Sequence, residues 1–158
     1  MSLGVKISGI SLKIFKLILV IIILIIYRTG YGNGEFLGVG GVWNHNEAKG
    51  ADAEIVASGT FIGFTVYTLI VLFAQCFDQS KGKSYRIEIV MNILGFFMWG
   101  AVGCIALIYW GGYMNEHKYT QVLNEKQVGI ALGTLCIIES ALYGCDTLIA
   151  YRELINSH

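Results

Sequence analysis

The run LILVIIILIIY at Leu17–Tyr27 contains no polar residue before its final tyrosine and indicates a chain built for a lipid solvent. Counted from Ile10, the span has 18 residues, and at about 1.5 Å per residue a helix there is about 27 Å long, enough to cross the hydrocarbon core. Lys13 and Lys16 lie inside the span, so we expect their side chains to snorkel towards the headgroups. Arg28 follows without a small-x-small cleavage site, which favours a retained signal anchor.

The composition of the chain points to the same solvent. Of its 158 residues, 55% are hydrophobic and 14% charged, whereas about a quarter of the residues in soluble domains are charged. Three more apolar runs are long enough to span a bilayer, at residues 55–77, 89–113 and 128–151. With 10–27 they predict an all-α membrane protein, one domain over 1–158 folded as a four-helix transmembrane bundle. The net charge is zero, so nothing indicates nucleic acid as a partner.

The lysines and arginines predict the sidedness of this bundle. With both termini cytoplasmic, seven of these residues lie inside and four outside, in agreement with the positive-inside rule. The outer loops are then 28–54 and 114–127. Tyr109, Trp110 and Tyr113, at the outer end of the third span, are expected to form an interfacial aromatic belt.

The first outer loop combines seven glycines with a group of apolar side chains. Asn33-Gly34 is typical of a hairpin turn, so we expect a short extracellular β-hairpin as a loop cap on the bundle. Apolar side chains outside the bilayer need a surface that covers them. We therefore predict that the loop contacts partner proteins through five residues, Phe36, Leu37, Val39, Val42 and Trp43.

Two spans carry small residues at a spacing that allows helices to approach closely. Gly59 and Gly63 form a G-x-x-x-G motif in the second span. The fourth span carries the same motif, continued along one face: Gly129, Gly133, Cys136, Ser140 and Gly144. Such faces pack helices either within one bundle or between molecules. We favour packing within the bundle for both motifs. The alternative is packing between molecules, which would give a homo-oligomer.

The fourth span also contains two acids, Glu139 and Asp146, which are seven residues apart and therefore lie on nearly the same face. By helical rise Asp146 is at the depth of Lys16, and we predict that the two side chains pair inside the membrane. For Glu139 two interpretations remain. We favour a protonated or hydrogen-bonded carboxyl that serves assembly; the alternative is an ion- or proton-binding proteolipid or transporter subunit that uses Glu139.

No sequence pattern for catalysis or cofactor binding is present. The chain has no Ser/His/Asp set, no pair of carboxylates placed for a cleft and no phosphate-binding loop, so we expect that it is not an enzyme. Its three histidines are isolated, and its four cysteines fall within or at the ends of apolar runs. We therefore expect no cofactor, no metal site and no disulfide-stapled ectodomain.

Three segments together resemble the snakeskin family of small four-pass membrane proteins: YRTGYGNGEFLGVGGVWNHNEAKGADAEIVASG at 27–59, MNILGFFMWGAVG at 91–103 and GIALGTLC at 129–136. The likeness covers nearly the whole chain. It implies a structural component of smooth septate junctions at the lateral plasma membrane of gut-type epithelia, acting in cell adhesion, junction assembly and the paracellular barrier. It also implies membrane partners, namely a Mesh-like single-pass protein and a tetraspanin.

Overall fold

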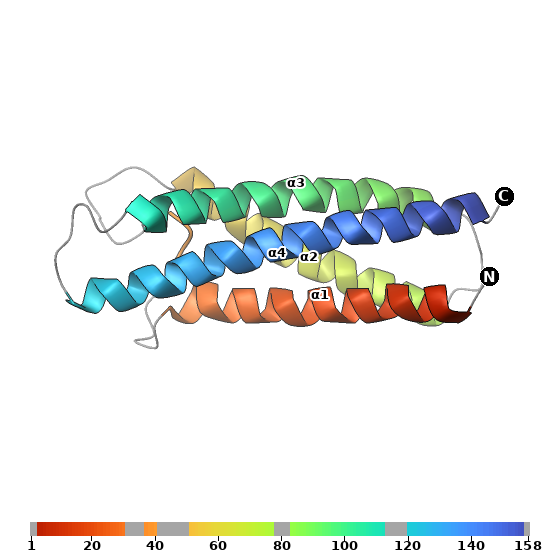
Figure 1. Ribbon diagram of the computed structural model, residues 1–158, viewed down its shortest axis with the longest axis horizontal. Helices are drawn as coiled ribbons and strands as arrows, with labels where there is room; N and C mark the ends of the chain where they lie inside the picture. The colour runs from red at the N-terminus through yellow and green to blue at the C-terminus, as the bar shows by residue number, and fades with distance from the viewer. Residues whose placement is uncertain (1–2, 31–36, 41–50, 78–82, 113–119, 157–158) are drawn as a thin grey trace.

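The computed structural model contains four long helices, and Figure 1 shows them side by side in one elongated bundle. It describes residues 3–30, 37–40, 51–77, 83–112 and 120–156. The helices are α1 (Leu3–Thr29), α2 (Ala51–Phe77), α3 (Lys83–Gly112) and α4 (Thr120–Asn156).

Consecutive helices run in opposite directions along the bundle. Helix α1 begins and α4 ends at the same end, called here the terminal end (Figure 1). The opposite end, where α1 ends and α2 begins, is called the loop end. An up-down-up-down order of this kind is what short connections between bundle helices produce.

Each helix contains a segment that is long and apolar enough to cross a membrane. These segments are Gly9–Thr29, Asp52–Ala74, Arg86–Gly112 and Glu125–Asn156. The predicted fold class, an all-α four-helix transmembrane bundle, is confirmed. No strand occurs among the described residues, and the turn expected at Asn33-Gly34 lies outside them.

The helices extend past the apolar runs that identified them in the sequence. The run at 89–113 belongs to a helix that begins at Lys83, and the run at 128–151 to one that spans Thr120–Asn156. Nine of the 19 flanking residues, at 83–88, 120–127 and 152–156, are Lys, Arg, Glu or Gln, which form helices well in water. The chain also contains no proline that would stop a helix.

The distribution of side chains is the reverse of that in a soluble protein. Large apolar side chains are exposed along all four helices, for example Ile25, Ile70, Phe97 and Leu148. Charged side chains, in contrast, lie in the interior, where Lys16 is 1% exposed. Such a surface suits acyl chains and would be unstable in water, which supports insertion in a bilayer.

The small-residue face of α4 packs against α3, and this is the most extensive helix interface of the bundle. A side chain at Gly129 would overlap the indole of Trp110, and one at Gly133 would overlap Leu107. Further along, Ser140 Oγ donates a 2.6 Å hydrogen bond to the Phe96 carbonyl. Gly144 faces the Phe96 ring.

The glycines of α2 have different surroundings. Outside their own stretch of helix, no described residue has an atom within 4 Å of the position that a Cβ on Gly59 or Gly63 would take. They line an open apolar groove between α2 and α3, together with Phe64, Met91, Met98 and their neighbours. The motif of α4 is thus used inside the chain, whereas the motif of α2 is open to lipid or to another molecule.

This contrast predicts different outcomes for two matched substitutions. Gly129→Ala should destabilise the bundle by about 1–3 kcal/mol, because its methyl group must displace the Trp110 ring from a filled core. Gly59→Ala should leave stability unchanged or slightly higher, because alanine is the better helix former and meets no neighbour. Denaturant unfolding in detergent micelles, followed by tryptophan fluorescence, measures both. Equal losses in the two variants would contradict the assigned interface.

Candidate functional site

The four-residue segment 37–40 lies within the first loop and is held against the loop end of the bundle by hydrogen bonds of its backbone. The amide of Leu37 donates to the Tyr27 carbonyl at 3.2 Å, at the end of α1. The amides of Val39 and Gly40 both donate to Oε1 of Glu54 on α2, at 2.6 and 2.9 Å. A single carboxylate oxygen therefore satisfies two consecutive backbone donors, and the segment is tied to two helices.

Gly38 lies at the centre of this arrangement. Its φ is +69°, a left-handed conformation that residues with a Cβ rarely adopt. A Cβ there would also collide with the Glu54 carboxylate. The Gly38 carbonyl accepts a 3.4 Å hydrogen bond from Nε1 of Trp110 on α3, so a third helix contributes to the anchor.

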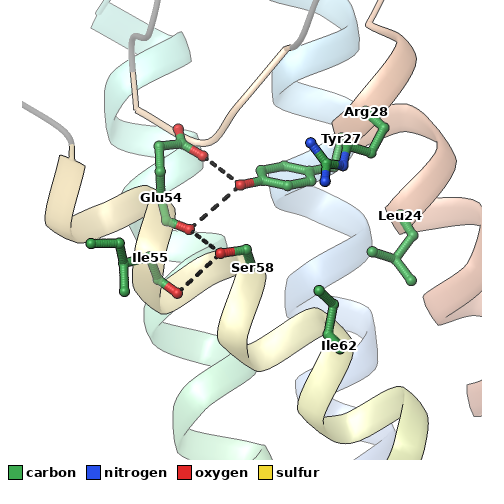
Figure 2. A pocket seen from close by; sticks show the side chains of 7 residues that line it. All are labelled: Leu24, Tyr27, Arg28, Glu54, Ile55, Ser58 and Ile62. Atoms are coloured by element: carbon green, nitrogen blue, oxygen red, sulfur yellow. Dashed lines mark hydrogen bonds between the residues drawn. The ribbon is translucent and has the colours of Figure 1, made fainter.

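Tyr27 and Glu54 join α1 to α2 beneath the segment, as Figure 2 shows. The Tyr27 hydroxyl donates to Glu54 Oε2 at 2.8 Å, and its ring meets Phe61 edge-on with centroids 5.0 Å apart. Beside them a cleft of about 260 Å³ separates the two helices, lined also by Leu24 and Arg28. We call Tyr27, Glu54 and Trp110, with the segment 37–40, the loop anchor.

Two of the five predicted partner contacts belong to this anchor. Leu37 and Val39 are 1% and 0% exposed and pack in the hydrophobic core of the bundle. Their apolar surface is covered by the chain itself, so the structure removes them from the contact surface. The other three, Phe36, Val42 and Trp43, lie outside the described residues.

The expected aromatic belt is also modified by the structure. Trp110 is fully buried against Gly129 and does not lie at the lipid surface. Its position follows from the absence of a side chain at Gly129, which leaves room for an indole. Tyr109 is partly exposed, and Tyr113 lies outside the described residues.

A second group of polar side chains is buried in the terminal half of the bundle. Nζ of Lys16 on α1 lies 2.5 Å from Oδ2 of Asp146 on α4, the pair expected from helical rise. Nζ of Lys13 lies 3.0 Å from Oδ1 of the same carboxylate and 2.5 Å from Oε1 of Glu88 on α3. All four side chains are at most 5% exposed. We call them the ionic cluster.

The two lysines do not snorkel, contrary to the expectation from the sequence. They turn into the bundle because two carboxylates at the same depth hold them there. Lys16 also lies 3.8 Å from the centroid of the Tyr143 ring, a cation–π geometry, and 3.5 Å from Oδ1 of Asn92. Tyr143 in turn shares a 3.1 Å hydrogen bond with Thr68 on α2. Through these contacts the cluster reaches all four helices.

Glu139 lies near the middle of α4 and is separate from the ion pairs. It is fully buried, and neither carboxyl oxygen has a hydrogen-bond partner in the part of the chain that the structure describes. Among the same residues, no group of three or more His, Cys, Asp or Glu side chains is placed to hold a metal ion.

Several residues of both sites were not singled out from the sequence. Glu54 was assigned to the loop, although an acid at the start of a helix after a glycine-rich segment is a signal for amide binding. Lys13 was expected at the headgroups, and Glu88, which directly precedes the apolar run at 89–113, was given no role. To predict their partners, one must know how α1, α3 and α4 are rotated about their own axes relative to one another. Hydropathy does not give that rotation.

The chain is similar over most of its length to two insect proteins. It is 54% identical over 144 residues to Protein snakeskin of Bombyx mori, an alignment that covers 91% of each chain. It is 50% identical over 144 residues to Protein snakeskin of Drosophila melanogaster, covering 91% of this chain and 88% of the relative. These identities confirm the resemblance seen in the three segments. No family model matches the chain, and no solved structure does.

The loop anchor predicts how Glu54 substitutions change backbone protection. Glu54→Ala should increase hydrogen exchange at Val39 and Gly40 about tenfold or more, because a buried amide left without its acceptor costs about 1–3 kcal/mol. Glu54→Gln is the matched control: its carbonyl oxygen can still accept from both amides, and the Tyr27 hydroxyl can accept from its NH₂ group. Exchange mass spectrometry in nanodiscs measures both variants. Equal protection in the alanine variant and the wild type would refute the assigned role of Glu54.

Proposed function

Because the chain belongs to the snakeskin family, we propose that it is a structural component of smooth septate junctions, the occluding cell–cell junctions of invertebrate gut-type epithelia. In this role it is a non-enzymatic membrane protein of the lateral cell border. It acts in junction assembly and cell adhesion and thereby restricts paracellular leak. The observation that carries the proposal is the identity of 50–54% with snakeskin proteins over 91% of the chain.

The loop anchor supports this proposal in physical terms. Three helices hold the segment 37–40 through its backbone, so the loop leaves the bundle from a fixed point. A preorganised surface loses less conformational entropy when it binds a partner. With both termini cytoplasmic, as the positive charges favour, the loop end faces the extracellular space.

The proposed contact surface consists of the three predicted contact residues that lie outside the described part of the chain, Phe36, Val42 and Trp43. Phe36 precedes the anchored segment directly, and Val42 and Trp43 follow it closely. A large aromatic side chain at the centre of an interface often contributes most of the binding energy. The proposed partners are a Mesh-like single-pass protein and a tetraspanin.

The open glycine face of α2 is a further place where a membrane partner could contact the bundle. Gly59 and Gly63 allow close approach of a helix, and no residue of the described chain uses that approach. A partner at this face would be a helix in the same membrane, whereas a partner at the first loop would bind from the extracellular side.

The alternative function, ion or proton transport through Glu139, makes a different prediction for the purified protein. A transport subunit would carry flux across reconstituted vesicles in the absence of any partner, and Glu139→Gln would abolish it. A junction component should show no flux that depends on this residue.

The junction function predicts a barrier defect in a defined loop variant. In a polarised gut epithelium, the endogenous protein is replaced by wild type, by Val42→Asp with Trp43→Ala, or by Asn46→Ala with Lys49→Ala as a polar control in the same loop. We expect the first variant to reach the surface but to lower transepithelial resistance, raise tracer leak and disperse the partners. The control should behave as wild type.

Surface biotinylation separates loss of function from loss of delivery in this experiment. If the Val42 and Trp43 variant is delivered normally and the barrier stays tight with its partners in place, the loop is not the contact surface. If complete removal of the protein also leaves resistance and tracer leak unchanged, the junction function itself is wrong.

A further inference from the structure

The buried charges of the bundle balance only when Glu139 is left out of the count. The two lysines of the ionic cluster contribute two positive charges, and Glu88 and Asp146 contribute two negative charges, so their sum is zero. An ionised Glu139 would leave the interior with one uncompensated negative charge.

No described cation is available to compensate that charge. Lys16 on α1 is already engaged, since its Nζ lies 2.5 Å from Oδ2 of Asp146 and 3.8 Å from the centroid of the Tyr143 ring. Lys13 is shared between Glu88 and Asp146. Moving either lysine to Glu139 would leave another buried carboxylate without its partner.

The other groups around Glu139 are neutral polar or apolar side chains. Cys136 and Tyr143 lie one turn before and one turn after it on α4, and both are fully buried. Ser140, the next residue on α4, is also buried, and its hydroxyl donates to the Phe96 carbonyl. Further buried polar groups of this core come from other helices: Tyr67 and Thr68 on α2, and Asn92 and Trp99 on α3. None of them supplies a positive charge.

The surroundings of the Glu139 carboxyl therefore disfavour its charged form. Both oxygens are buried without a hydrogen-bond partner among the described residues, and an isolated carboxylate in an apolar interior is strongly unfavourable compared with its neutral form. A divalent metal would need further ligands, and no group of three acidic, His or Cys side chains stands there in the described chain. A single proton needs no further protein ligand and makes the carboxyl neutral, which removes the unfavourable buried charge.

We propose that Glu139 is a proton-binding site at the centre of the bundle, holding one proton in the folded protein. The bound proton makes the interior electrically neutral, while the ionic cluster on its terminal side stays fully paired. Loss of the proton would leave the interior of the described bundle with one uncompensated negative charge. This site is independent of the junction function, which requires no titratable group inside the membrane.

Infrared difference spectroscopy of the full-length protein in lipid nanodiscs tests this proposal without any need for access to the site. Wild type minus Glu139→Gln should contain the carbonyl stretching band of one protonated carboxyl group per chain. The control is wild type minus Asp52→Asn, which removes an exposed acid and leaves the buried cluster intact. It should contain carboxylate stretching bands and no protonated-carboxyl band.

The outcomes of this experiment are distinct. If the Glu139→Gln difference contains carboxylate bands, whether or not they shift between sodium, potassium and choline salts, Glu139 is ionised and the proposal is wrong. Glutamine has the shape of the protonated acid, so the variant should fold with wild-type yield and helicity. A large loss of folded protein in Glu139→Gln, with Asp52→Asn unaffected as an exposed control, would also overturn the proposal.

Discussion

The ion pairs that Lys13 and Lys16 make with Glu88 and Asp146 are the constraint on which the arrangement of the helices depends. In lipid there is no hydrophobic effect to press apolar helices together, because acyl chains are as apolar as leucine. A charged side chain inside the bilayer, in contrast, is stable only next to a group of opposite charge. One orientation of α1, α3 and α4 brings these four side chains within hydrogen-bond distance, and any large rotation of one helix would leave a charge exposed to lipid.

The loop anchor complements this constraint at the opposite end of the bundle. The ionic cluster fixes α1 against α3 and α4, while Tyr27, Glu54 and Trp110 fix the first loop to the ends of α1, α2 and α3. Helix α2 has smaller interfaces than the others, and its glycine face is open. Helices α1, α3 and α4 are therefore joined by the ionic cluster, whereas α2 packs on them through smaller interfaces. The segment 37–40 is fixed at the loop end by the loop anchor.

The sequence allowed the helices and one ion pair to be predicted, because both depend on position along the chain. Hydropathy identifies a span, and helical rise places Lys16 and Asp146 at one depth. Rotation about the helix axis is not given by either property. For that reason Lys13 was expected at the headgroups and Trp110 at the lipid surface, whereas both are buried. Leu37 and Val39 were misplaced for a related reason: a local apolar pattern does not say whether the chain's own core or a partner covers it.

A double-mutant cycle between Lys16 and Asp146 tests the central claim most directly. Lys16→Met and Asp146→Leu are compared singly and together by reversible unfolding in mixed micelles. Each single substitution should cost about 3–5 kcal/mol, because it leaves the buried ionic cluster with one uncompensated charge. The double variant should lose far less than the sum, with Lys13 still paired to Glu88. Additive losses would show that the two side chains act independently, and the helix arrangement would then need another explanation.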